Sequence, residues 1–93
     1  MKAVLLFDER RNIDLDRFVE LTVWQVPRPV RASTHRFKYR LAFVVEGICV
    51  LFYDNEAGKG DHRHLGAVES PCTFPTPEQL YADFMADVTN WRG

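Results

Sequence analysis

The stretch His35-Arg-Phe-Lys-Tyr-Arg-Leu-Ala-Phe-Val-Val45 decides the fold of this chain. An apolar, mostly aromatic set of side chains alternates there with a second set that begins with basic ones: Phe37, Tyr39, Leu41, Phe43 and Val45 against Arg36, Lys38, Arg40, Ala42 and Val44. Successive side chains of a strand point to opposite faces, so this period of two predicts a β-strand with its aromatic face toward a core. The basic set then lies on the other face of the sheet.

The dipeptide Glu46-Gly47 separates this strand from the apolar run Ile48–Tyr53. Because glycine takes positive φ readily, the pair predicts a two-residue hairpin turn. In the register of such a turn, Arg40 lies opposite Tyr53 on the basic face. The same alternation puts Asp54 on the aromatic side of the sheet.

Two further strands and one helix follow from the rest of the sequence. Lys2–Asp8 and Phe18–Val26 are apolar-rich runs bounded by polar clusters, which is typical of strands. Thr76-Pro-Glu-Gln79 has the pattern of a capped helix start, and apolar residues follow it at helical spacing. We therefore expect an α+β fold: an antiparallel, meander-like β-sheet of about four or five strands with one C-terminal α-helix packed on its apolar face.

Length and composition fit a single globular domain over residues 1–93, with 46% hydrophobic and 13% aromatic residues. A domain of this size buries only about 60–65% of the surface that its unfolded chain exposes, so a homodimer or a tight partner would add to its stability. Cys49 and Cys72 lack the spacing of a disulfide framework, and no signal peptide precedes them, which predicts a cytoplasmic protein with reduced thiols. The longest apolar run, Ile48–Tyr53, is far short of the about 20 residues of a membrane helix, so no membrane contact is expected.

Charge is distributed unevenly, although the formal net charge is only −1. Residues 28–40 hold five basic side chains and no acidic one. Clustered arginine and lysine favour a polyanion such as RNA, and the predicted phosphate contacts are Arg36, Lys38 and Arg40. A solvated strand face would explain the same charges.

The segment Tyr53–Gly66 combines side chains that folding alone rarely needs in one loop. His62 and His64 flank Arg63, so in an extended segment the two imidazoles lie on one side, about 6–7 Å apart. In RNA cleavage one imidazole would take the proton of a 2′-hydroxyl and the other would protonate the leaving oxygen. The other predicted members of this site are Lys59, Arg63 and Arg40 as phosphate contacts and Tyr53 as a stacking or proton-network residue.

Two other interpretations fit the same histidines. A metal site would use His62 and His64 with Asp54 or Asp61 as a third ligand. A purely structural loop would have its histidines bonded to backbone carbonyls. The GxxxxGK[ST] pattern is absent around Lys59, so nucleoside triphosphate binding is not expected.

These residues together resemble the TumE family, the small toxin components of bacterial toxin–antitoxin pairs. The resemblance rests on His35–Val45, the Gly47 turn and Tyr53–Gly66, with Trp24–Pro27 before them and Glu69–Pro71 after them. It implies a cognate antitoxin, typically a helix-turn-helix protein that neutralises the toxin by binding it. In one place the chain departs from the family pattern: Cys72 follows Pro71, where an aromatic residue is expected.

Three functions are therefore compatible with the sequence. The first is a toxin of a type II toxin–antitoxin pair that cleaves RNA as a metal-independent endoribonuclease, with no cofactor. The second is a non-enzymatic binding module that acts through the basic sheet face in complex with a helix-turn-helix antitoxin. The third is a metal-assisted hydrolase at His62 and His64.

Overall fold

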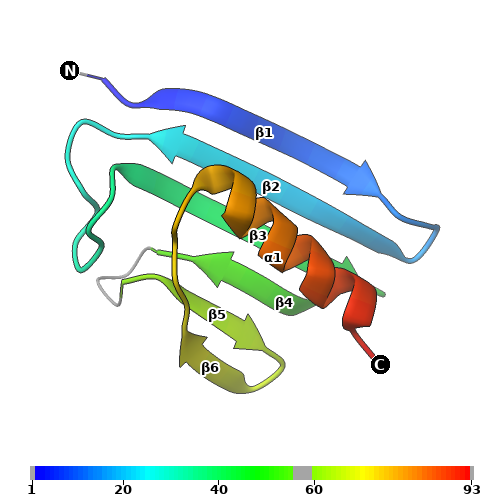
Figure 1. Cartoon of the computed structure of the whole chain (residues 1–93). Coiled ribbons are helices and arrows are strands. Elements are labelled where there is room, and N and C mark those ends of the chain that lie inside the picture. The colour runs from blue at the N-terminus through cyan, green and yellow to red at the C-terminus, as the bar shows by residue number, and fades with distance from the viewer. Residues whose placement is uncertain (1, 56–59, 93) are drawn as a thin grey trace.

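Helix α1 lies across one face of an antiparallel sheet whose strands follow one another in chain order (Figure 1). The computed structural model describes residues 2–55 and 60–92. Its elements are β1 (Val4–Asn12), β2 (Arg17–Gln25), β3 (Phe37–Val45), β4 (Ile48–Asp54), β5 (His62–Leu65), β6 (Val68–Pro71) and α1 (Pro77–Asn90). The predicted α+β meander with a C-terminal helix is confirmed, with β1 and β6 at the two edges of the sheet.

The sheet has six strands within the described residues, which is more than the sequence predicted. The additional strands are β5 and β6, each of four residues. Runs this short carry too little alternation to be told apart from a loop. Gly66 turns the chain between them at φ 60°, and this turn places Glu69 opposite His64.

The hairpin turn predicted between β3 and β4 is confirmed. Glu46 and Gly47 both have positive φ, at 51° and 77°. Positive φ at both central residues gives the turn a twist that matches the twist of the flanking strands. The N–H of Glu46 donates to the carbonyl of Asp16 at 2.8 Å, which holds a non-glycine residue in a conformation that it rarely adopts.

The predicted register between β3 and β4 is wrong beyond this turn. The pairing shifts between Phe43 and Val44, so that Arg40 lies opposite Asp54 and Leu41 lies opposite Tyr53. One extra residue in β4 forms a bulge, and a shift of one residue moves every later side chain to the other face. Arg40 therefore does not pair with Tyr53, and Asp54 does not lie on the core side.

The two faces of the sheet differ in what they carry. The covered face, which packs against α1, carries the buried side chains Val19, Leu21, Val23, Tyr39, Leu41, Phe43, Leu51 and Tyr53. The open face is the opposite one; the register places on it Thr22, Arg40, Ala42, Phe52, Asp54, His62, His64 and Glu69. Among the described residues no helix covers the open face (Figure 1).

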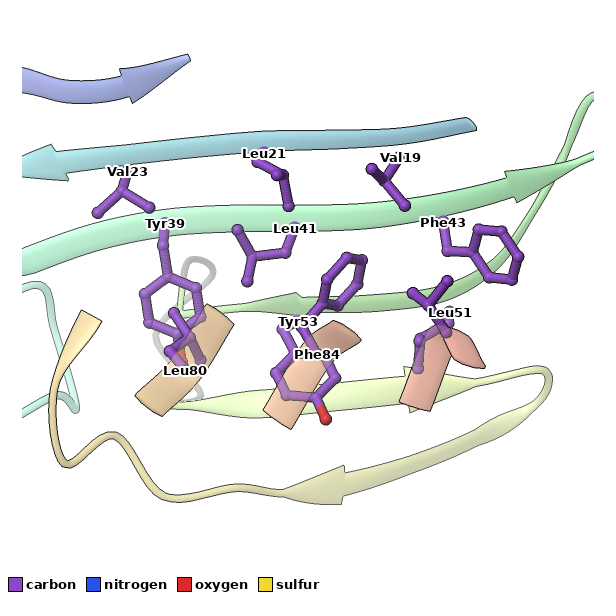
Figure 2. Close-up of a cluster of buried hydrophobic side chains, with 11 residues drawn as sticks. Val19, Leu21, Val23, Tyr39, Leu41, Phe43, Leu51, Tyr53, Leu80 and Phe84 are labelled. Carbon is purple, nitrogen blue, oxygen red and sulfur yellow. The ribbon is translucent and has the colours of Figure 1, made fainter. Parts of the chain in front are cut away.

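Helix α1 begins as the sequence predicted. The hydroxyl of Thr76 accepts a hydrogen bond from the N–H of Gln79 at 3.0 Å, and proline occupies the first helical position. The helix buries Leu80 and Phe84 against the covered face (Figure 2). Val88, one turn further along the helix, is buried as well. In the described part of the chain no helix is long and apolar enough to cross a membrane.

Candidate functional site

A group of polar and aromatic side chains lies on the open face, across β4, β5 and β6. Strand register places Asp54 opposite His62, Phe52 opposite His64, and His64 opposite Glu69. Because alternate residues of β5 share a face, His62 and His64 lie together, and their ring centroids are 5.3 Å apart. The structure therefore brings the two predicted histidines into one cluster.

His62 contacts protein oxygens at both ring nitrogens. Its Nδ1 lies 2.8 Å from the carbonyl oxygen of Gly60. Its Nε2 lies 2.8 Å from Oδ1 of Asp54, close enough for an ion pair, and the histidine side chain is only 7% exposed. Only the contact with Gly60 has the geometry of a hydrogen bond. Oδ1 of Asp54 is buried and has no hydrogen bond of acceptable geometry to any described residue. His62 can exchange a proton with a substrate only after one of these contacts has broken.

His64 is more accessible than its neighbour, with 25% of its side chain exposed. Its ring stacks on Phe52 with centroids 4.2 Å apart, and its Nε2 lies 2.5 Å from Oε2 of Glu69. On β3 the guanidinium carbon of Arg40 lies 5.5 Å from the centroid of the Phe52 ring, within the range of a cation–π contact. Arg40, Phe52 and His64 thus form a continuous row on the open face.

Glu69 is the member of this group that the sequence did not reveal as a functional residue. It lies five positions after His64, and only the turn at Gly66 brings the two residues opposite each other. The signal that could have found it was that glycine, which permits a tight hairpin after His64. A carboxylate bonded to an imidazole nitrogen fixes the orientation of the ring, so Glu69 positions His64.

The predicted metal-binding set is partly assembled. Potential ligand atoms of His62, His64 and Glu69 all lie within 4.8 Å of one another. Asp54, one of the two predicted third ligands, adjoins His62. The other, Asp61, belongs to a different cluster.

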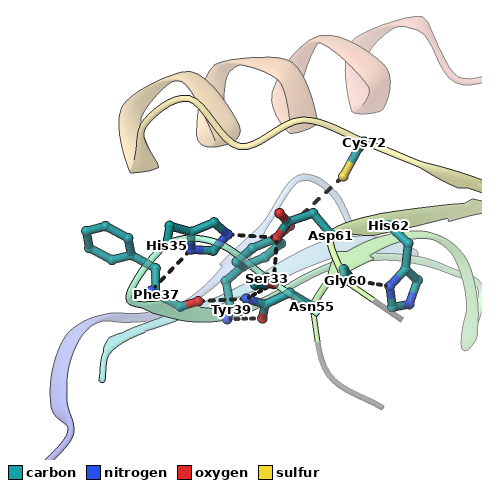
Figure 3. Close-up of polar contacts among 9 residues, drawn as sticks. All are labelled: Ser33, His35, Phe37, Tyr39, Asn55, Gly60, Asp61, His62 and Cys72. Atoms are coloured by element: carbon teal, nitrogen blue, oxygen red, sulfur yellow. Dashed lines mark hydrogen bonds and ion pairs between the residues drawn. The ribbon is translucent and has the colours of Figure 1, made fainter. Parts of the chain in front are cut away.

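Asp61 holds together the segments beside β3 and β5, as Figure 3 shows. Its Oδ1 accepts hydrogen bonds from the hydroxyls of Tyr39 at 2.9 Å and Ser33 at 3.4 Å, and it lies 2.8 Å from Nε2 of His35. His35 in turn stacks on Phe74 with ring centroids 3.8 Å apart. His35 therefore joins Asp61 and not the histidines of β5, and this cluster connects the segment before β3 to the start of β5.

Asn55 and Gly60 fix the ends of the segment that connects β4 and β5. The fully buried Asn55 accepts from the N–H of Tyr39 at 3.1 Å and donates to the carbonyl of Phe37 at 2.6 Å. Gly60 has φ 77°, and a Cβ atom there would lie 2.8 Å from the carbonyl oxygen of Ala32. These constraints set where β5 begins and hence which face His62 occupies. Lys59, a predicted phosphate contact, lies outside the described residues.

Arg63 and Tyr53 lie on the covered face, away from the histidines with which they were predicted to act. Arg63 lies opposite Tyr53, and its Nη1 is 2.6 Å from Oδ2 of Asp87 on α1. The hydroxyl of Tyr53 donates to the same carboxylate oxygen. Burial, together with the bond to Asp87, raises the pKa of the Tyr53 phenol well above its ordinary value. This position is incompatible with stacking on a base at the open face, because Tyr53 is only 4% exposed.

The predicted basic residues of β3 are placed on the solvent side. Lys38 and Arg40 are both exposed, and they alternate with the buried Tyr39 and Leu41, as the period of two requires. Arg36 is exposed as well, but it precedes the first residue of β3. Of the three basic residues predicted around β3, Lys38 and Arg40 therefore belong to the open face.

The chain was compared with known protein families, curated proteins and solved structures. A family model described as Toxin TumE matches residues 4–92. The chain belongs to the TumE family. The match covers the sheet and the helix and confirms the resemblance seen in the sequence, and it supports a toxin role with an antitoxin partner. No curated protein and no solved structure matches the chain.

Proposed function

We propose that this TumE-family chain is the toxin of a toxin–antitoxin pair and that it cleaves RNA on its open face. The observation that carries the proposal is the row formed by Arg40, Phe52 and His64, in which a cation, an aromatic ring and an imidazole follow one another at 5.5 Å and 4.2 Å. Single-stranded RNA is commonly bound by aromatic rings and basic side chains on a sheet surface. The open face offers both kinds of group.

Lys38 and Arg40 would contact the phosphates of such a strand. Both are exposed and both point away from the core. Phosphate contacts supply most of the sequence-independent affinity for nucleic acids, and base contacts supply specificity. The half-buried ring of Phe52, already stacked on His64, offers the edge of an aromatic platform next to these cations.

His64 is the group best placed for the first proton transfer, because Glu69 orients it and a quarter of its side chain is exposed. In this reaction the imidazole takes the proton of a 2′-hydroxyl, and the 2′-oxygen attacks the adjacent phosphorus. The bond from phosphorus to the 5′-oxygen breaks, which leaves a 2′,3′-cyclic phosphate and a 5′-oxygen that receives a proton. His62 would supply that proton after release from Asp54, and Arg40 would stabilise charge on the phosphate.

The test is incubation of the purified chain with total bacterial RNA, with and without a chelator, beside the variants His64→Ala and Glu20→Gln. Glu20 is an exposed open-face residue outside the histidine group and serves as the matched control. We expect cleavage by the parent and the control and a loss of about 100-fold or more in His64→Ala, the range seen for general acid–base groups. Cyclic phosphate termini on the products would identify attack by the 2′-oxygen.

Folded protein that leaves RNA intact, or His64→Ala that cleaves as fast as the parent, would contradict the proposal. The first result would favour the alternative function, a non-enzymatic module that binds its target through the basic face. Binding of labelled single-stranded RNA, measured on the same samples, separates that alternative from a protein with no affinity for RNA.

The antitoxin partner that the family indicates is proposed to be a helix-turn-helix protein. Val4, Leu5 and Leu6 of the edge strand β1 are 43–54% exposed, which is apolar surface that a partner chain can cover. Co-expression with the product of the neighbouring gene, followed by gel filtration, measures the complex. The same column run without that gene product measures whether the chain alone is a monomer or a homodimer.

A further inference from the structure

Two imidazoles and two carboxylates meet at the end of the open face formed by β4, β5 and β6. They come from three strands: Asp54 from β4, His62 and His64 from β5, and Glu69 from β6. Potential ligand atoms of His62, His64 and Glu69 lie within 4.8 Å of one another. Asp54 Oδ1 lies 2.8 Å from His62 Nε2, so a fourth potential ligand adjoins this group.

The contact of His62 with Gly60 decides which nitrogen can bind an ion. A carbonyl oxygen only accepts hydrogen bonds, so Nδ1, at 2.8 Å from Gly60 O, must carry the hydrogen. The Nε2 of a neutral imidazole then presents its lone pair. A histidine that binds a metal almost always donates its other N–H in this way to a carbonyl or a carboxylate.

Asp54 provides the second, independent observation. Its Oδ1 faces Nε2 of His62 at 2.8 Å, yet this buried oxygen has no hydrogen bond of acceptable geometry among the described residues. A lone pair on nitrogen and a carboxylate oxygen at this distance repel each other unless a proton or a metal cation lies between or beside them. A cation satisfies both groups at once, whereas an ill-directed N–H does not.

His64 and Glu69 complete the site. Nε2 of His64 lies 2.5 Å from Oε2 of Glu69, and stacking on Phe52 at 4.2 Å fixes the plane of the imidazole. Glu69 is exposed on the edge strand β6 and belongs to a hairpin only four residues long on each side, so its side chain has room to adjust. Ligand atoms about 2.0–2.2 Å from a tetrahedral zinc ion lie closer together than 4.8 Å. Side-chain rotations that move these atoms by about 1 Å would bring them to zinc-binding distance.

We propose that His62, His64 and Glu69 bind one zinc ion, with the carboxylate of Asp54 beside it. Two imidazole nitrogens and one carboxylate oxygen are a ligand set typical of zinc sites that keep a fourth position open for water or substrate. Magnesium and calcium prefer oxygen ligands throughout, so they do not fit a site with two imidazoles. Located next to Arg40 and Phe52, such an ion keeps the proposed cleavage of RNA, on which this part of the inference rests, but it would activate the 2′-hydroxyl in place of His62 and His64, because an imidazole nitrogen bound to zinc exchanges no proton.

The test measures ion binding directly and does not depend on RNA cleavage. The chain is prepared without a histidine tag and stripped with a chelator, and zinc is titrated against a chromophoric competitor; Co²⁺ is then substituted to report tetrahedral geometry by its visible spectrum. Cys49→Ser is introduced in every sample, because the exposed Cys49 thiol could bind zinc by itself. His64→Gln and Glu69→Gln are the test variants, and Glu20→Gln is the matched control.

The parent and Glu20→Gln are expected to bind one zinc ion per chain, and His64→Gln and Glu69→Gln to bind it at least about tenfold more weakly. Far-ultraviolet circular dichroism without metal checks that each variant is folded. The proposal is overturned if the folded parent takes up no zinc at unit stoichiometry, or if both variants bind it as tightly as the parent. Zinc binding without RNA cleavage would support this site and contradict the proposed function, and RNA cleavage by a parent that binds no zinc would do the reverse.

Discussion

The two faces of strand β5 carry neighbouring residues with opposite tasks. Arg63 points to the covered face and binds Asp87 of α1, so its charge serves to attach the helix. His62 and His64, one position before and after it, point to the open face and meet the carboxylates of Asp54 and Glu69. A segment that reads as one functional motif in sequence is therefore divided by alternation into a structural half and a candidate functional half.

The aromatic residues on the two faces of the sheet differ in the same way. On the covered face, Tyr53 packs edge-on against Phe84 with centroids 5.4 Å apart, and both are almost fully buried. On the open face, Phe52 is only half-buried, and its ring contacts the guanidinium of Arg40 and the imidazole of His64. Stability is thus concentrated on one face, which leaves the other face available for binding.

The largest expected effect concerns this difference between the aromatic residues. Phe84→Ala removes a fully buried ring from the core and should lower the free energy of unfolding by about 3–5 kcal/mol. Phe52→Ala should cost only on the order of 1 kcal/mol, because the ring is half-buried. Urea unfolding of the two variants measures both values. Equal losses would show that the open face is as important for stability as the covered face.

Alkaline pH should lower the free energy of unfolding through two tyrosines buried on the covered face. Burial raises the pKa of both Tyr39 and Tyr53 in the folded chain, while in the unfolded chain tyrosine titrates near pH ~10. The unfolded state therefore loses these protons first. The contribution of the two protonated phenols to the free energy of unfolding is complete below pH ~10, and it is lost as the pH rises from there toward the pKa of the folded state. The slope approaches about 1.4 kcal/mol per pH unit for each phenol.

Urea midpoints measured from neutral pH to above pH ~10 test this dependence. Tyr53→Phe has no phenol to titrate and should show a shallower alkaline loss than the parent. An unchanged slope in that variant would mean that Tyr53 is not held in its protonated form by the fold.

The attachment of α1 gives the next effect. Asp87→Ala removes the carboxylate that accepts from both Tyr53 and Arg63, and it should cost about 1–2 kcal/mol. Asp83→Ala is the matched control: it makes the same change on the same helix but removes only an exposed bond from Gln79. We expect the control to stay within about 0.5 kcal/mol of the parent in thermal or urea unfolding. A control as destabilised as Asp87→Ala would contradict the proposed link between helix and sheet.

The smallest expected effect separates two of the predicted phosphate-binding arginines, Arg40 and Arg63. Arg40→Gln should lower the slope of log affinity for single-stranded RNA against log salt concentration by about 1, because one phosphate contact is lost. Arg63→Gln should leave that slope unchanged and lower stability instead, since this guanidinium is bound to Asp87. Fluorescence anisotropy at several salt concentrations measures the slopes. A reduced slope in Arg63→Gln alone would reverse the roles assigned to the two faces.

Local patterns predicted the main elements correctly. The alternation in β3, the two-residue turn at Gly47 and the capped start of α1 at Thr76 were all legible, because each depends on residues close together in the sequence. The hairpin β5–β6 escaped prediction because each of its strands has only four residues. His62 and His64 were correctly expected to share a side, since that too follows from local alternation.

The sequence by itself determined the order of the four longer strands and the helix, the aromatic core face, the family and the shared side of the two imidazoles. Only the tertiary structure decided what those imidazoles meet. A single extra residue in β4 moves Asp54 to the open face and Tyr53 to the core, and the turn at Gly66 brings Glu69 to His64. Both outcomes depend on pairing between strands, and a shift of one residue there reverses the face of every side chain that follows.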